Sequence, residues 1–369
     1  MYTVCHITTV HIAKDIRIYH KECKALAEAG YDVKLVVVNA KDTKSDYQGV
    51  EIINVPVDAS SKVKRILNAP KKARAVAESL NADVYHFHDP EFLFEARRLR
   101  KKGFRVIYDV HEDVPNQVRS KYWIPGFIRP LVSAGVKMVE MSVAKHLSSI
   151  VTVVDSIAER FDKVNKHVVQ IRNYPRLEEL PSPKQWASKE DYVCYVGDIT
   201  QIRGVYDGIQ ALTRTNMKML LAGRFPSKPF ENEVTTSEGW KSVDFLGFIS
   251  RSEIADVLNR SKIGLVTLHP TPSYVEALPV KLFEYMAAGI PVIASNFGWL
   301  KKIVEQHNCG LAVDPQNPRE IANAINWLCD HDDEARQMGE RGRKAVEESY
   351  NWASEEEKLI GLYSKILGN

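Results

Sequence analysis

Short apolar runs alternate with amphipathic segments along most of the chain, and this alternation constrains the fold more than any other feature. In the first half, helical patterns such as 63–80 and 128–146 lie between apolar runs. These runs occupy residues 3–8, 32–38, 52–55, 84–87, 105–110, 150–154 and 168–171. Strands that alternate with helices usually pair in parallel, with helices on both faces of the sheet. The sequence therefore predicts a doubly wound α/β fold.

The alternation is interrupted once, which predicts two domains. Residues 174–191 contain three prolines and several charges without apolar periodicity, as expected of a linker. A length of 369 residues suits two domains that each have a core. We expect domains at 1–173 and 192–350, followed by a helical segment at 351–369 with apolar residues at helical spacing. Within the second domain, Ser252 is expected to cap a helix over 252–259.

Charge and cysteine content narrow the class of protein. The five cysteines lack paired or metal-ligand spacing, and no apolar run is long enough to span a bilayer, so we expect a cytoplasmic chain with reduced thiols and no signal peptide. Residues 1–173 carry about +8 of net charge, with basic clusters at 62–74 and 97–102. Each cluster is either a solvated helix face or a surface for anionic lipid. Nucleic acid is not an expected partner, because no stacking aromatics accompany these charges.

A strong candidate site surrounds two glutamates, Glu276 and Glu284. Glu276 lies in a loop after the apolar run 263–268, and Glu284 lies in the short helical segment that follows. Eight helical residues advance about 800°, which leaves such a pair roughly 80° apart rather than on one helix face. Leu278 and Val280 open the helix, whose free N–H groups suit a phosphate. Lys281 stands where the helix dipole disfavours a cation, so a bound anion would explain its position.

Two further turns of the second domain carry candidate ligand contacts. Gly197 ends an apolar run, and Arg203 follows it closely. Glycine allows close approach of a ligand to the backbone, and a cation beyond it can pair with phosphate, although such turns are common. The turn at 246–249, which contains Phe248, is equally typical of an ordinary strand-to-helix connection.

In the first domain, polar residues follow several predicted strands, at the edge where open parallel sheets bind ligands. His111 follows the strand at 105–110, and Asp89 follows the strand that contains His86. After the first strand come three more candidates: His11, Asp15 and Arg17. His86 and His88 share one strand face and could hold a metal, but the sequence offers no clear third ligand, so no metal site is predicted.

The spacing Glu276-x7-Glu284, followed by the stretch from Tyr285 to Ser295, resembles the signature of the family-4 retaining glycosyltransferases of the group 1 type. The resemblance covers the C-terminal half well and the N-terminal half more loosely. It implies the GT-B architecture: two Rossmann-like domains facing an interdomain cleft, with a terminal helix that crosses back to the first domain. It also implies a nucleotide-diphosphate sugar as donor, and neither a metal nor another cofactor.

The resemblance implies roles for individual residues. Arg203 matches a family cation that holds the donor diphosphate, but Asp198 stands where a second cation is usual, and Arg224 or Lys281 could replace that cation. Glu284 would hold the ribose, while Glu276 and His111 would contact the transferred sugar as catalytic-site residues. The donor-binding set is then Gly197, Arg203, Arg224, Phe248, Leu278, Val280, Lys281 and Glu284. Since the family's glycine-rich loop is replaced here, the candidate acceptor contacts are His11, Asp15, Arg17 and Asp89.

The expected activity is transfer of a sugar from a UDP- or GDP-linked donor to a lipid-linked saccharide. We expect this step in assembly of a capsular or other cell-surface polysaccharide, on the inner face of the plasma membrane. The apolar loop at 123–128 is either a core loop or an element that enters the membrane interface. Two alternatives remain: a catalytically silent GT-B subunit that partners another glycosyltransferase, or a nucleotide-sugar epimerase.

Overall fold

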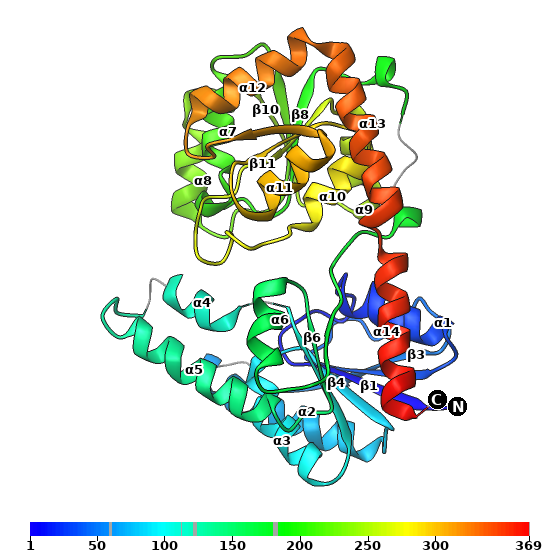
Figure 1. Cartoon of the computed structure of the whole chain (residues 1–369). Coiled ribbons are helices and arrows are strands. Elements are labelled where there is room, and N and C mark those ends of the chain that lie inside the picture. Colours follow the sequence, from blue (N-terminus) through cyan, green and yellow to red (C-terminus); the bar gives the residue numbers. More distant parts are fainter. Residues whose placement is uncertain (59–60, 112, 121–123, 180–183, 369) are drawn as a thin grey trace. The chain divides into compact units, whose positions relative to one another are not determined.

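The computed structural model describes residues 1–58, 61–111, 113–120, 124–179 and 184–368, and divides the chain into two compact units (Figure 1). Unit 1 comprises residues 1–173 together with 352–369, and unit 2 comprises 174–351. Of the segment expected to be a linker, residues 180–183 lie outside the described part. Its remaining residues belong to unit 2 and include short 3₁₀ turns at Leu177–Glu179 and Trp186–Ser188.

Unit 1 contains a seven-stranded sheet, parallel throughout, in the order β3-β2-β1-β4-β5-β6-β7. The strands are β1 Thr3–Thr8, β2 Asp32–Val38, β3 Val50–Val55, β4 Val84–Phe87, β5 Arg105–Val110, β6 Ser149–Thr152 and β7 Val168–Gln170. The expected doubly wound fold is confirmed, because the strand order reverses between β1 and β4. Apolar strand residues such as Val4, Leu35 and Ile107 are fully buried, as expected of a sheet covered on both faces.

The helices of unit 1 follow the predicted pattern with additions. They are α1 Lys24–Glu28, α2 Lys62–Ser79, α3 Leu93–Lys101, α4 Val114–Ser120, α5 Arg129–Ala144, α6 Asp155–Asp162 and α14 Trp352–Leu367. A π-helical turn, Ile18–Cys23, precedes α1. The terminal helix α14 buries Trp352, Leu359 and Tyr363 in the same core as residues of β1 and β2. Figure 1 shows this helix beside the unit 1 sheet.

Unit 2 contains a six-stranded parallel sheet in the order β10-β9-β8-β11-β12-β13. The strands are β8 Tyr192–Val196, β9 Lys218–Ala222, β10 Val243–Gly247, β11 Ile263–Val266, β12 Val292–Ser295 and β13 Gly310–Val313. The helices are α7 Val205–Leu212, α8 Lys228–Thr235, α9 Arg251–Arg260, α10 Val280–Ala287, α11 Gly298–His307, α12 Pro318–Asp330 and α13 Asp332–Ser349. Here the order reverses between β8 and β11.

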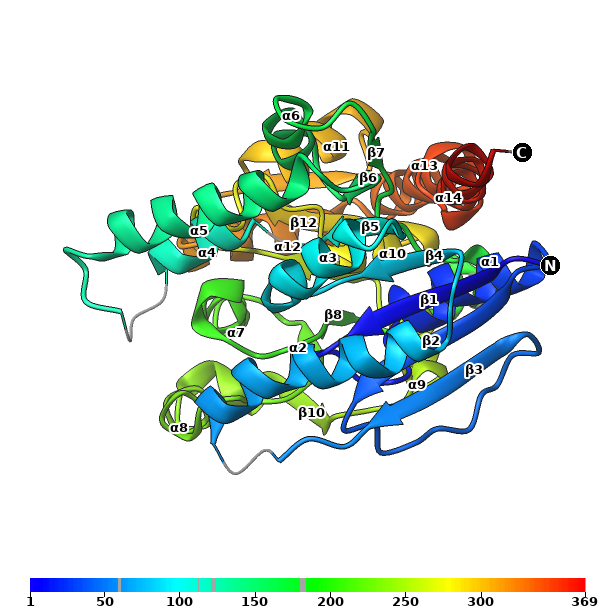
Figure 2. The ribbon, with the colours of Figure 1, turned by 90° about the horizontal axis from the view of Figure 1, so that it is seen from below.

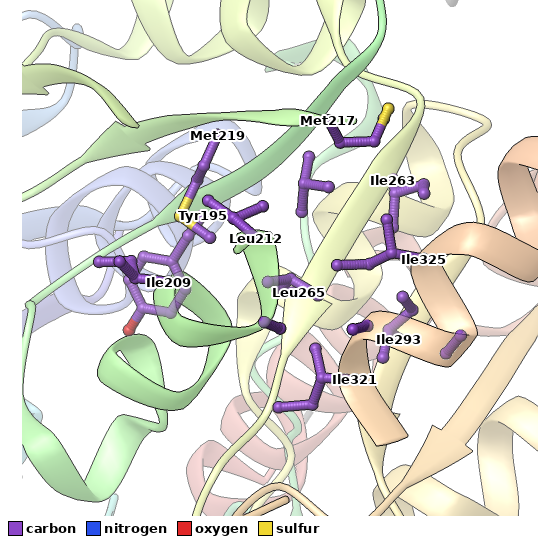
Figure 3. Close-up of a cluster of buried hydrophobic side chains, with 14 of the residues drawn as sticks. Tyr195, Ile209, Leu212, Met217, Met219, Ile263, Leu265, Ile293, Ile321 and Ile325 are labelled. Atoms are coloured by element: carbon purple, nitrogen blue, oxygen red, sulfur yellow. The ribbon is translucent and has the colours of Figure 1, made fainter. Parts of the chain in front are cut away.

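Two apolar clusters cover the two faces of the unit 2 sheet. On one face, Ile209 of α7 and Ile325 of α12 pack against strand residues such as Leu265 (Figure 3). On the other, Leu282 of α10 and Ile303 of α11 pack with Val266 and their neighbours. None of the helices in the described residues is long and apolar enough to cross a membrane.

The expected cap of α9 is wrong by two residues. Ser250, not Ser252, is the N-cap: its hydroxyl accepts the Glu253 N–H, and the Glu253 carboxylate accepts the Ser250 N–H at 2.7 Å. This reciprocal capping box satisfies two N–H groups that a helix start leaves without partners, and it begins the helix earlier than the apolar pattern suggests.

Candidate functional site

In unit 2, the loops that leave β8 and β11 face each other at the point where the strand order reverses. Gly197 follows β8, and the loop from 267 to 279 follows β11 before α10 begins. In open parallel sheets the carboxyl ends of two such strands form the usual ligand crevice, because their connections run to opposite faces. The predicted donor residues therefore lie at the position where this fold binds ligands.

Two glycines bring the backbones of these loops together. Gly204 has a φ of +68°, and a Cβ at this position would lie 1.8 Å from the carbonyl oxygen of Thr267. Gly197 has a φ of +130°, a conformation that side chains rarely adopt. Thr267 Oγ1 also donates to the Gly204 carbonyl at 3.2 Å. This packing fixes the position of Arg203, which directly precedes Gly204.

Two cations converge on the backbone of Gly197. A Cβ built on this glycine would lie 3.1 Å from Lys281 Nζ and 3.5 Å from Arg203 Nη1. The Lys281 side chain is buried, and its ammonium lies 3.6 Å from the centre of the Tyr195 ring. Within the described part of the chain this ammonium has no hydrogen-bond acceptor. Burial and the neighbouring Arg203 guanidinium lower the pKa of Lys281 well below its usual range.

The start of α10 adds a helix N-terminus to this pair of cations. Pro279 is the N-cap residue, and no side chain caps the helix. The first N–H groups of an uncapped helix favour anions, whereas Lys281 in the first turn is unfavourable by itself. A basic pair, a tight glycine turn and an open helix start together form a binding site suited to a diphosphate.

The two glutamates that led to this site differ in their surroundings. Glu284 is buried on α10, and its Oε1 accepts a hydrogen bond from Arg251 Nη1 at 2.7 Å. Glu276 lies in the β11–α10 loop and is exposed. Arg251 was not among the predicted site residues, and neither were Asp207 and His269, which lie 2.8 Å apart through Oδ2 and Nε2. No motif pointed to them, because they come from separate helices and loops.

The remaining donor candidates lie at the β9 and β10 ends. The Arg224 guanidinium stacks on the exposed Phe248 ring, 3.7 Å from its centre. Asp198 Oδ2 is 3.7 Å from Arg203 Nη2, a distance at which the carboxylate partly neutralises this cation. The Lys281 ammonium lies beside Gly197, whereas the Arg224 guanidinium stacks on Phe248.

In unit 1, four predicted residues gather where the strand order reverses between β1 and β4. His11 Nε2 lies 3.4 Å from Asp89 Oδ1, and His11 Nδ1 lies 3.4 Å from Asp15 Oδ2. The His11 and His111 ring centres are 5.4 Å apart. Thr9 N donates to the Asp89 carboxylate at 2.6 Å and holds it against the end of β1. The structure thus places these side chains at one edge of the sheet.

Arg17 differs from the other acceptor candidates because its side chain is buried. Its Nε and Nη2 each donate to the Asp109 carboxylate at 2.9 Å, and its Nη1 donates to the Ile171 carbonyl at 3.0 Å. The guanidinium is committed to these partners, and its charge stabilises the interior of unit 1. By contrast, the His11 and Asp15 side chains remain 33% and 24% exposed.

The sequence offered no third metal ligand beside His86 and His88, but the fold brings Glu22 and Asp109 to them. Ligand atoms of these four residues lie within 4.8 Å of one another. However, Arg17 Nε lies 3.1 Å from Glu22 and 2.9 Å from Asp109, so a cation already balances the carboxylates. Burial and Asp109 raise the pKa of Glu22 well above its usual range, which disfavours the charged form that a metal ligand needs. A buried divalent ion would add uncompensated positive charge.

Comparisons with known proteins agree with this arrangement. Residues 17–173 match the protein family described as "Glycosyltransferase Family 4", and residues 177–345 match the family described as "Glycosyl transferases group 1". An MMP alpha-(1->4)-mannosyltransferase of Mycolicibacterium hassiacum is 23% identical over 315 residues, which cover 80% of this chain and 74% of that protein.

Solved structures show the same fold. A sucrose-phosphate synthase from Thermosynechococcus elongatus superposes with a TM-score of 0.81 at 21% identity, with all of both chains covered. Anabaena Alr3699/HepE, in complex with UDP and glucose, superposes with a TM-score of 0.73 at 13% identity, covering 99% of this chain and all of that one. The two family matches span both units, and so the chain belongs to the group 1, family 4 glycosyltransferases, enzymes with the GT-B fold.

Proposed function

We propose that this glycosyltransferase uses a nucleotide-diphosphate sugar whose diphosphate binds beside Gly197 in unit 2. The observation that carries the proposal is the buried Lys281 ammonium, which lacks a hydrogen-bond acceptor and lies next to Arg203. An ammonium buried without a partner costs free energy, so its retention beside a second cation indicates an anionic ligand. The UDP bound to the Anabaena relative supports a nucleotide of this kind.

The neighbouring residues then take defined roles. Arg203, Lys281 and the first amides of α10 neutralise the diphosphate, whose negative charge grows as the sugar leaves. Glu284 holds the ribose hydroxyls through its carboxylate, which Arg251 orients. The turn around Phe248 lies along the base. Glu276 and His111 contact the transferred sugar.

We propose that the reaction retains the anomeric configuration and needs no metal. The resemblance of residues 276–295 to retaining enzymes supports the first point. The second rests on charge: two side-chain cations and a helix N-terminus can stabilise a leaving diphosphate electrostatically. Whether UDP or GDP is the natural carrier follows from neither argument, so both classes of donor enter the test.

The test is a turnover assay with UDP- and GDP-sugars in the presence of EDTA, followed by NMR of the anomeric proton of the product. Donor consumption that persists in EDTA, with an axial α-donor giving an α-product, is expected. Glu284→Gln should lower turnover, whereas Glu305→Gln on the exposed face of α11 should not. Turnover that stops in EDTA, or a product of inverted configuration, would refute the corresponding proposal.

The acceptor is proposed to be a lipid-linked saccharide on an anionic membrane, within surface-polysaccharide assembly. The support lies on α5 and the residues just before it: Phe127, Leu131 and Met138 recur at helical spacing and are 87%, 75% and 72% exposed. Helix α5 extends beyond the sheet of unit 1 (Figure 2). Exposed basic residues nearby, among them Arg119 and Lys137, suit anionic headgroups. Of the predicted interfacial loop, Trp123 lies outside the described residues.

Sedimentation with vesicles tests this acceptor proposal. Binding to vesicles that contain phosphatidylglycerol, but not to pure phosphatidylcholine, is expected, and Leu131→Ser with Met138→Ser should weaken it. Leu67→Ser removes a similarly exposed leucine from α2 and serves as the control. Equal loss in both variants would show that the exposed residues of α5 have no special role in vesicle binding. No vesicle binding by the wild type would contradict a membrane-bound acceptor.

A further inference from the structure

A continuous set of hydrogen-bonding side chains crosses the interior of unit 1 from the terminal helix to the predicted site. It begins with Tyr363 on α14, continues through histidines of β1 and β4, and ends at Asp109 and His111 beside the carboxyl end of β5. The side chains of Tyr363, His6, His86, His88 and Asp109 are buried, and that of His111 is 14% exposed. Because water does not reach most of these groups, they must find their hydrogen-bond donors and acceptors among one another.

The Asp109 carboxylate sets the direction of the first hydrogen bonds. Burial alone would raise its pKa, but the Arg17 guanidinium and His111 hold the pKa well below its usual range, so Asp109 is ionised and can only accept. Its Oδ2 lies 2.6 Å from His111 Nε2 and 3.3 Å from His88 Nδ1. His111 Nε2 must therefore carry a proton. His88 Nδ1 lies 3.1 Å from that nitrogen as well as 3.3 Å from the carboxylate, and we assign it a proton that it donates to the charged acceptor, Asp109. An unprotonated nitrogen at either position would direct its lone pair at the carboxylate.

The remaining protons follow from this first assignment. A neutral His88 with a proton on Nδ1 has a lone pair on Nε2, which accepts from His6 Nδ1 at 3.0 Å. His6 Nε2 then accepts from the Tyr363 hydroxyl at 3.3 Å. The Tyr363 oxygen in turn accepts from His86 Nδ1 at 2.8 Å. Here the chain ends, since His86 Nε2 has no hydrogen-bond partner among the described residues.

The rings on β1 and β4 are neutral, as this scheme requires. Burial lowers the pKa of His6 and His86 well below the usual range, and it lowers the pKa of His88 to about 4. Each of these neutral rings therefore carries one N–H proton, either on Nδ1 or on Nε2. With His88 Nδ1 as a donor to Asp109, the three neutral rings, one hydroxyl and one carboxylate fit an arrangement in which every donor points toward Asp109 along the chain.

We infer that this ordered chain fixes His111 as the Nε2–H tautomer, so that Nδ1 is the nitrogen that accepts a hydrogen bond from a substrate hydroxyl. Asp109 and His88 are then positioning residues for His111, and Tyr363 connects the same network to α14. Within the described residues, His111 Nδ1 has no hydrogen-bond partner in the protein. The inference deepens the proposed function, on which it rests, by naming the atom of His111 that acts.

The decisive experiment is a long-range ¹H–¹⁵N correlation spectrum of the protein labelled with ¹⁵N-histidine, which reports directly which ring nitrogens carry protons. The expected result at pH 7 is Nε2–H for His111 and Nδ1–H for His6, His86 and His88. The ring signals that disappear from the spectrum of the His111→Gln variant are those of His111. A proton on Nδ1 of His111, or a mixture of its two tautomers, would overturn the inference.

Tyr363→Phe tests the direction of the chain. Removing the hydroxyl deprives His86 Nδ1 of its acceptor, so the His86 ring should lose its single tautomer. His6, His88 and His111 should keep theirs, because their order is set from the Asp109 end. A change of tautomer at His111 in this variant would contradict the scheme.

Kinetics separate this role from a structural one. In His111→Gln, the side-chain amide can still donate to Asp109 from near the Nε2 position, but the acceptor at Nδ1 is lost. We expect kcat to fall at least tenfold while the affinity for the nucleotide, which binds in unit 2, is unchanged. An unchanged kcat would overturn the role of Nδ1. Failure of the wild type to bind UDP or GDP would instead refute the proposed function, whatever the tautomers are.

Discussion

At the scale of single residues, Lys281 has opposite effects on stability and binding. Its buried ammonium lacks an acceptor, so Lys281→Met, which keeps most of the side-chain volume, should raise the free energy of unfolding by about 1–3 kcal/mol. Urea denaturation measures this change. Lys262→Met is the matched control, because Lys262 is paired with Asp191 and Asp332 at the surface and should change stability by about 0.5 kcal/mol or less. Destabilisation by Lys281→Met would show that the ammonium is satisfied in the free protein.

The lowered pKa of Lys281 also links nucleotide binding to protons. A bound diphosphate favours the charged ammonium and raises this pKa, so binding takes up a proton at pH values between the free and bound pKa. Affinity should therefore decrease as the pH rises through that window. Calorimetry above pH 8, in two buffers of different ionisation enthalpy, measures the uptake while the phosphates stay ionised. Equal binding enthalpies in both buffers would exclude the linkage, and Lys281→Met should abolish it.

At the scale of elements, the connection between β8 and α7 should tolerate little change. Gly204→Ala places a Cβ 1.8 Å from the Thr267 carbonyl oxygen at a φ of +68°. We expect it to destabilise unit 2 by more than about 3 kcal/mol and to displace Arg203. Gly361→Ala is the control: Gly361 is an exposed position of helix α14, its Cβ meets nothing within 4 Å, and a gain of about 0.5–1 kcal/mol is expected. Thermal unfolding of the two variants should therefore shift in opposite directions.

Most strands and most long helices could be predicted from the sequence, because local patterns determine them. Runs such as 219–222 are continuously apolar, and glycines such as Gly223 mark their boundaries. The helices α4, α6, α8 and α11 and the strand β13 were not predicted. The α9 cap was assigned to Ser252, whereas the Ser250–Glu253 pair decides it. Such ends depend on reciprocal side-chain hydrogen bonds, which an apolar pattern does not reveal.

The candidate donor site could be proposed from the sequence for the same reason, since Glu276, Lys281 and Glu284 come from one contiguous segment. The hydrogen-bond network around Asp109 could not be predicted from the sequence. Glu22, Asp109 and Tyr363 lie far apart in the sequence, on the π-helical turn, β5 and α14, and only the tertiary packing of unit 1 brings them to His86 and His88. The burial of Arg17 was not predicted, because it depends on an ion pair with Asp109. In the sequence, Asp109 is simply a residue near the end of a strand, and nothing links it to Arg17.

At the scale of the whole molecule, the buried histidines should make the protein sensitive to acid. The folded pKa values of His6, His86 and His88 lie below the unfolded value of about 6.5, so the unfolded chain binds more protons below that pH. Stability should fall as the pH decreases from about 6.5 toward 4, by at most about 1.4 kcal/mol per pH unit for each ring. Urea unfolding at several pH values measures the slope.

A suitable control for this pH dependence is His331→Ala. His331 is exposed and stacks on Trp327, so its removal should leave the slope unchanged. A free energy of unfolding that stays constant between pH 7 and 5 would mean that the three rings are accessible to protons in the folded chain. It would also remove the basis for treating them as neutral.

The central claim is that a nucleotide diphosphate binds at the cations beside Gly197, and titration calorimetry with UDP and GDP tests it most directly. We expect one nucleotide to bind the wild type and Lys262→Met with equal affinity, and to bind Lys281→Met about 10- to 100-fold more weakly. Because Lys281→Met should be the more stable protein, such a loss cannot be attributed to unfolding. Unchanged affinity in Lys281→Met, or binding of neither nucleotide to the wild type, would contradict the account.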